Sequence, residues 1–130
     1  MNEVINLAVI TGMLSTMLTL ATPLLFAALG ETFSQNSGVL NLGVDGIMLL
    51  GAFGAFYAVL TTGNLWLGVV VAMLIGLLMG LMMSFVSVTL KAEQGVSGIG
   101  LQMFGLGMSS LLFKQLVGTV RTIRGFPRLP

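Results

Sequence analysis

The sequence contains no cysteine and no histidine. Without cysteine, a disulfide framework and a thiolate metal site are both excluded. Without histidine, the commonest general base and the commonest metal ligand are missing. No glycine-rich phosphate-binding loop followed by Lys and Ser or Thr occurs either. The sequence therefore predicts no metal and no other cofactor, and it favours neither an enzymatic activity nor ATP hydrolysis by this chain.

Charge is also scarce. The 130 residues include five Lys or Arg and four Asp or Glu, so 7% are charged, whereas an ordinary soluble domain has about 25%. So few charges cannot coat a surface that faces water. The net charge of +1 forms no basic stripe, so no nucleic-acid partner is expected. The composition instead indicates a protein surrounded largely by lipid.

Three long stretches carry no charge at all, namely residues 4–30, 46–90 and 94–113. A helix needs about 20 consecutive apolar residues to cross the hydrocarbon core of a bilayer. The first and third stretches suit one crossing each, and the second suits two. We therefore expect an all-α, polytopic membrane bundle with about four transmembrane or part-spanning helices, in a single transmembrane domain over residues 1–130.

Polar and glycine-rich stretches separate the expected helices. The first helix covers residues 4–29 and contains Pro23, and residues 31–38 (ETFSQNSG) are expected to be a connection. The second covers 39–60, the third 65–90 and the fourth 96–117, joined by a turn at 61–64 and by KAEQ at 91–94. Within the third helix, the GLLMG stretch at 76–80 has a spacing that allows close helix approach, although this spacing also arises incidentally in glycine-rich membrane helices.

The second segment begins with an unusual mixture of polar and small residues. Asn41 and Asp45 lie four apart, so they share one face if this stretch is helical. Gly38, Gly43 and Gly46 surround them, and each glycine weakens a helix by about 1 kcal/mol in water. We expect a partly unwound start to this helix, at membrane depth, that lines protein or water rather than lipid.

Asp45 is the polar residue that most needs an explanation, because a carboxylate within a membrane segment costs about 2.5–3.5 kcal/mol on insertion scales. One interpretation places it on a translocation path or at a hinge beside it. The other places it near the interface, as a cap on the helix that follows Gly46, where the helix dipole favours a carboxylate. Asn41 and Gln102 are likewise either path-lining residues or hydrogen-bonding contacts between helices. An aspartyl protease needs two paired carboxylates, and only Glu31 is available as a second one.

Three stretches together resemble a known family of transport proteins. They are LATPLLFAALGETFSQNSG at 20–38, SGVLNLGVDGIMLLGAFGA at 37–55 and KAEQGVSGIGLQMFGLGMSS at 91–110. They are similar, in the same order, to permease subunits of bacterial ABC importers of the branched-chain amino acid and ribose type. The closest branch is that of the nucleoside or simple-sugar permeases. Asp45 stands where that branch often has Glu, and Gln102 stands where it usually has Asn.

The resemblance implies an N-terminal fragment of a longer permease that forms part of the path for a nucleoside or simple sugar. The implied partners are ATP-binding subunits, a second permease subunit and an extracytoplasmic substrate-binding lipoprotein, at the bacterial inner membrane. Asn41, Asp45 and Gln102 are then expected near the path, with Gly38, Gly43 and Gly46 allowing an irregular backbone there. The family pattern also implies that KAEQ is cytoplasmic and that residues 118–130 lie outside, although Arg121, Arg124 and Arg128 favour the reverse by the positive-inside rule.

Three alternatives stay open at this point. The first is a permease of the same family that carries branched-chain amino acids. The second is an ion-coupled secondary transporter in which Asp45 binds a proton or a cation. The third is a purely structural membrane subunit.

Overall fold

The computed structural model describes residues 7–118. It is all-helical in this range, and four of its helices are long and apolar enough to cross a membrane. They are α1 (Leu7–Asn36), α2 (Val44–Thr62), α3 (Leu65–Ser84) with the π-helical extension η1 (Phe85–Thr89), and α4 (Gln94–Leu112) with η2 (Phe113–Val117). The expected all-α membrane architecture is confirmed, and the chain is a multi-pass membrane protein.

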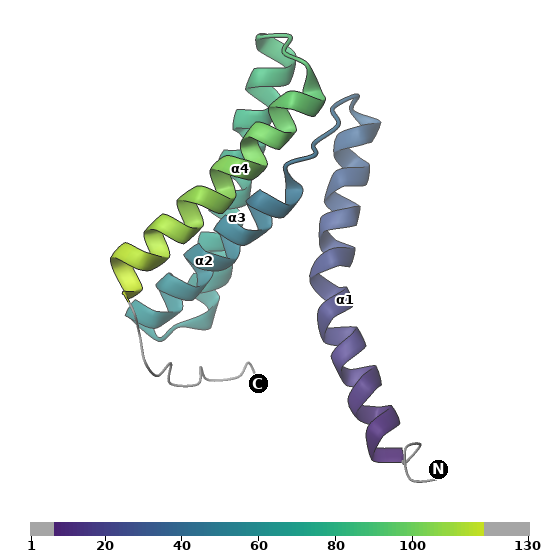
Figure 1. Cartoon of the computed structure of the whole chain (residues 1–130), viewed down its shortest axis with the longest axis vertical. Helices are drawn as coiled ribbons and strands as arrows, with labels where there is room; N and C mark the ends of the chain where they lie inside the picture. Colours follow the sequence, from purple (N-terminus) through teal and green to yellow (C-terminus); the bar gives the residue numbers. More distant parts are fainter. Residues whose placement is uncertain (1–6, 119–130) are drawn as a thin grey trace.

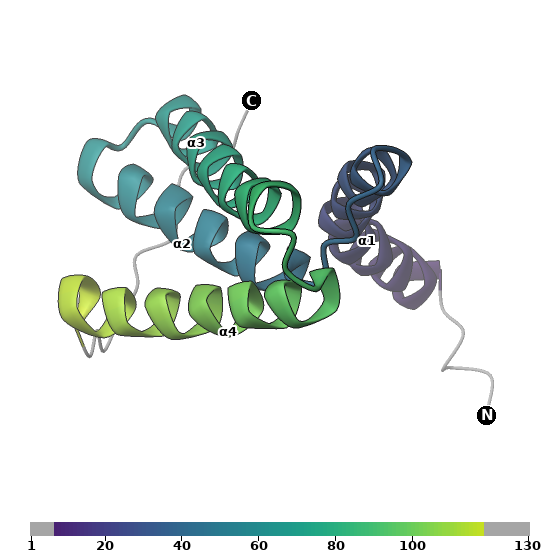
Figure 2. The ribbon, with the colours of Figure 1, turned by 90° about the horizontal axis from the view of Figure 1, so that it is seen from above.

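Helices α2, α3 and α4 form a bundle, and α1 stands beside it and approaches it near its own C-terminal end (Figure 1). The α1–α2 and α3–α4 connections lie together at one end of the molecule, and the tight α2–α3 turn lies at the other. Seen from above, α2 lies between α3 and α4 (Figure 2). A small core of Met79 and Met83 from α3 and Leu101 from α4, with Ile47 and Leu50 of α2 packed against it, joins the three bundle helices.

Two expected boundaries need correction. Helix α1 continues through residues 31–36, which the sequence suggested were a connection. The side chains of this stretch support another helical turn, because Gln35 Nε2 donates to Glu31 Oε1 at 3.2 Å and Thr32 Oγ1 donates to the carbonyl of Ala28 at 2.7 Å. The irregular stretch is therefore shorter than expected and covers residues 37–43.

The crossing of α2 and α4 is built from glycines on both helices. A Cβ atom added at Gly46 would lie 2.6 Å from the Cα of Gln102, and one added at Gly105 would collide with the backbone of Gly46. At the same crossing, a Cβ on Gly43 would lie 2.7 Å from the carbonyl oxygen of Gly98. The two backbones can approach this closely only because these positions lack side chains.

The GLLMG stretch behaves differently from what its spacing suggested. Nothing lies within 4 Å of a Cβ added at Gly76 or Gly80. Within the described part of the chain, these glycines make no close helix contact, and both line a cavity instead.

The glycine crossing leads to a prediction about stability. Gly105→Ala should force α2 and α4 apart and lower the free energy of unfolding by about 1–3 kcal/mol, the usual cost of overpacking. Gly107→Ala, on the same helix but in open space, should be neutral or stabilising by up to about 1 kcal/mol. Thermal unfolding of the purified protein in detergent measures both changes. Equal unfolding midpoints for the two variants would contradict the close backbone contact between α2 and α4 at Gly105.

The arrangement of the connections leads to a prediction about orientation, made possible by a background free of cysteine. Ala92→Cys and Ser37→Cys lie at the same end of the bundle, and Thr62→Cys lies at the other. We expect an impermeant thiol reagent to label Thr62→Cys in intact cells and to leave the other two unlabelled. Labelling at Ala92→Cys would reverse the assigned orientation. The expected position of residues 119–130 falls outside the described part of the chain.

Candidate functional site

The irregular segment 37–43, which leads into α2, is held in place from a distance by a side chain of α4. The amide group of Gln94 forms two hydrogen bonds with the backbone of this segment. Its Oε1 accepts from the N–H of Leu40 at 2.8 Å, and its Nε2 donates to the carbonyl of Gly38 at 3.0 Å. Gln94 therefore takes the place of the neighbouring strand or helix turn that would otherwise satisfy these backbone groups.

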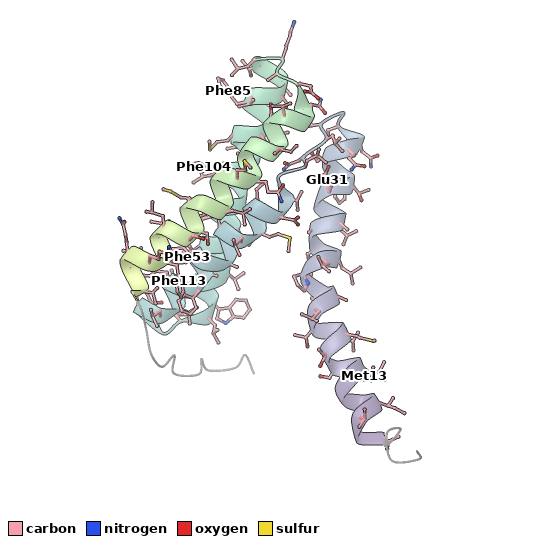
Figure 3. All side chains as sticks on the ribbon, in the orientation of Figure 1. Met13, Glu31, Phe53, Phe85, Phe104 and Phe113 are labelled. Carbon is pink, nitrogen blue, oxygen red and sulfur yellow. The ribbon has the colours of Figure 1, made fainter. Side chains whose placement is uncertain are left out.

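Helix α1 holds the same segment from the other side. Glu31 Oε1 accepts a hydrogen bond from the backbone N–H of Asn41 at 3.0 Å, and the Ser34 hydroxyl donates to the carbonyl of Val39 at 2.8 Å. Figure 3 shows Glu31 near the end of α1 that adjoins the connection to α2. The N–H of Val39 donates in turn to the carbonyl of Ser34. Side chains from α1 and α4 thus fix the position at which α2 begins.

The three glycines singled out in the sequence serve different purposes. Gly38 has φ +82°, a left-handed conformation that favours glycine. Gly43 and Gly46 are buried at the crossing with α4. Gly46 lies inside regular α2, so the irregular backbone expected at this residue is not present. Its role is close packing against Gln102.

Asn41 and Asp45 do not share a helical face, because Asn41 precedes the helix and Asp45 lies in its first turn. The Oδ1 atom of Asn41 accepts from the N–H of Gly43 at 2.9 Å, and this side chain is half-buried. Asp45 is exposed and accepts no hydrogen bond from any residue within 7–118. The N-cap of α2 is Gly43, so Asp45 is not the cap that one interpretation suggested. Its carboxylate still stands near the positive end of the helix dipole.

Gln102 lies on α4, opposite Gly46, and its side chain is half-buried. The structure brings Gly43, Gly46 and Gln102 together at the α2–α4 crossing and leaves Asp45 on the outer surface. Within the described range, the side chain of Gln102 makes no hydrogen bond between helices.

A cavity of about 560 Å³ lies beside the irregular segment, between α1, α2 and α3. We name it the α1–α3 cavity. Of the six residues proposed from the sequence, only Asn41 lines it. Its other polar lining groups are Glu31, Ser34, Ser37 and Ser84, and its apolar walls include Phe26, Ile47, Met48 and Met83.

Sequence reasoning missed both Glu31 and Gln94 as organising residues. A signal existed for Glu31, because it is the only charged residue between residues 4 and 44. Gln94 gave no local signal, because its two backbone partners lie more than fifty positions away in the chain. No group of three acidic residues that could hold a metal ion occurs within residues 7–118.

Comparison with known proteins places the chain in a family. Residues 13–129 match the model of the family described as the branched-chain amino acid transport system / permease component. Relatives include the putative glucose ABC transporter permease protein TsgC13 of Haloferax volcanii, which is 40% identical over 118 residues, covering 91% of this chain and 35% of the relative.

Two further relatives are permeases named for nucleosides. The guanosine ABC transporter permease protein NupQ of Bacillus subtilis is 35% identical over 108 residues, covering 78% of this chain and 34% of the relative. The nucleoside ABC transporter permease protein NupC of Lactococcus lactis is 33% identical over 120 residues, covering 88% of this chain and 37% of the relative. No solved structure matches.

The chain spans about a third of the length of these curated relatives. The family match covers most of the chain, and the four apolar helices agree with a membrane permease. The chain therefore belongs to the family of branched-chain amino acid transport system permease components.

Proposed function

We propose that this chain forms part of the substrate translocation path in the permease subunit of an ABC importer for nucleosides or simple sugars. The observation that carries the proposal is the similarity to three permeases whose names specify glucose, guanosine and nucleosides. The name of the wider family gives a second candidate substrate, a branched-chain amino acid. The similarity to the three named relatives favours the nucleoside or sugar.

The irregular segment 37–43 supports this proposal. Irregular backbone in a membrane protein is tolerated where it lines protein or a cavity rather than lipid. Here the segment borders the α1–α3 cavity through Ser37, Val39 and Asn41. We assign Asn41 to the path, with Gly38 and Gly43 shaping the backbone around it.

Gly46 and Gln102 support the path from the α2–α4 crossing, where the backbone contact at Gly46 fixes the start of α2 against α4. Asp45 is exposed in the first turn of α2. An exposed carboxylate within a membrane span is costly unless it faces water or another protein segment. We assign it to a surface of the path or of its hinge rather than to lipid contact.

The energy for transport would come from separate ATP-binding subunits, a proposal supported by the similarity to relatives named as ABC transporter permeases. A second permease subunit would complete the path, and an extracytoplasmic lipoprotein would deliver the substrate. In a bacterium, the assembly would lie in the inner membrane.

The substrate assignment can be tested in cells that lack the gene for this chain. Initial uptake rates are measured with a radiolabelled purine nucleoside, a hexose and leucine. We expect the deletion to abolish saturable uptake of the nucleoside or the hexose and to leave leucine uptake unchanged. Restoration by the intact gene is the control. Loss of leucine uptake alone would overturn the proposal in favour of an amino acid permease.

Asp45 gives a second prediction, measured as initial uptake rate per amount of membrane-inserted transporter. Asp45→Ala should lower the rate by about tenfold, which corresponds to about 1.4 kcal/mol in the barrier. Asp45→Glu should keep much of the activity, because the negative charge is retained. Asp45→Asn should lose activity if charge is required. Normal transport in Asp45→Ala would show that the residue serves neither the path nor the hinge.

A further inference from the structure

The α1–α3 cavity has the size of a small-molecule site. Its volume of about 560 Å³ falls within the range of about 300–1,000 Å³ that is usual for ligand pockets. Such pockets combine mostly apolar walls with a few placed polar groups. Phe26, Ile47, Met48 and Met83 form apolar walls here, and Glu31 is the only charged residue among the lining residues within 7–118.

Glycines keep this cavity open. Gly30, Gly76 and Gly80 line it, and a Cβ added at any of the three would meet nothing within 4 Å. These glycines are therefore not needed for close packing in the described part of the chain, although each lowers helix stability by about 1 kcal/mol relative to Ala. Larger side chains at these positions would extend into space that is empty.

Three polar groups at the cavity have hydrogen-bonding capacity that no residue within 7–118 uses. Glu31 Oε1 accepts from the Asn41 N–H and from Gln35, whereas Oε2 accepts no hydrogen bond. The amide nitrogen of Asn41 and the hydroxyl of Ser84 donate none. Ser84 also directly precedes the π-helical turn η1, and such turns are frequent at functional sites.

The chemistry of these groups selects the charge of a ligand. A free carboxylate oxygen accepts hydrogen bonds from hydroxyl and amine groups, and such charge-assisted bonds are among the stronger ones in proteins. The described lining contains no basic side chain, so a phosphate in the cavity would be repelled by Glu31 and would find no cation there to offset that repulsion. Asp45 adds a further negative charge in the first turn of α2, the helix that begins beside the cavity.

We propose that the α1–α3 cavity is a binding site for an uncharged, hydroxyl-bearing ligand, with Glu31 as the residue that accepts its hydroxyl groups and excludes anions. The inference rests on the proposed function and deepens it, because an unphosphorylated nucleoside or sugar fits this chemistry. A phosphorylated sugar or a nucleotide does not, because its phosphate would face the carboxylate of Glu31.

Two substitutions test the site without disturbing the backbone. Glu31→Gln removes the charge and keeps an oxygen that can accept from the Asn41 N–H. Gly80→Leu extends a side chain into the cavity from a position where an added Cβ meets nothing within 4 Å. The matched controls are Glu93→Gln, a carboxylate at the start of α4 outside the cavity lining, and Gly107→Leu, which also enters open space.

The measurement is equilibrium dialysis of the purified, intact transporter against a radiolabelled purine nucleoside, a hexose and the matching nucleoside monophosphate. For the neutral ligand that the wild type binds, we expect Glu31→Gln to weaken binding by about tenfold, as for one hydrogen bond to a charged group. It should also strengthen binding of the monophosphate. Gly80→Leu should abolish binding, and both controls should bind as the wild type does.

Wild-type affinity in both Glu31→Gln and Gly80→Leu would overturn the site while leaving the importer function intact. A different result would overturn the role assigned to Glu31. In that case Gly80→Leu weakens binding of the neutral ligand, whereas Glu31→Gln binds it as the wild type does and still does not bind the monophosphate. A wild-type transporter that imports neither the nucleoside nor the hexose in cells would instead overturn the proposed function.

Discussion

Backbone groups that lie within a membrane protein must find hydrogen-bonding partners inside the protein, and the start of α2 depends on this constraint. Residues 37–43 form no helix. The N–H groups of Ser37, Gly38 and Val39 still donate to carbonyls of α1, but the N–H groups of Leu40 and Asn41 and the carbonyl of Gly38 depend on side chains for their partners. Gln94 supplies both a donor and an acceptor, and Glu31 supplies a second acceptor. Without these side chains, the segment would carry polar backbone groups with no partner in the protein, which is costly wherever water is excluded.

The glycine crossing and the Gln94 contact depend on each other. Gln94 occupies the first turn of α4, and it reaches Leu40 only because α4 lies against the backbone of Leu42 and Gly43. Gly98 and Gly105 make this approach possible, since a side chain at either position would collide with α2 or with the segment before it. The same arrangement sets one wall of the α1–α3 cavity, whose other walls come from α1 and α3.

The sequence was informative about what is determined locally. Long uncharged stretches predicted four helices, and this prediction is confirmed. The glycines around Asn41 predicted irregular backbone at the start of the second helix; residues 37–43 are irregular, whereas Gly46 lies in regular helix. It was misleading where side chains act over one helical turn, as in the extension of α1 through Glu31 and Gln35. No pattern in the sequence indicated the role of Gln94, because a contact between segments distant in the chain produces no periodic signal. The functional roles of Asn41, Asp45 and Gln102 stay predictions.

The central claim is that this chain belongs to an importer driven by ATP. The most direct measurement uses sealed vesicles that contain the purified permease assembly with its ATP-binding subunits. Hydrolysable ATP, or a non-hydrolysable analogue, is placed on the side of the membrane where those subunits lie. We expect the substrate-loaded binding protein to support accumulation of a nucleoside or sugar only with hydrolysable ATP, and we expect dissipation of ion gradients to have no effect. Accumulation driven by an imposed ion gradient in the absence of ATP would contradict it.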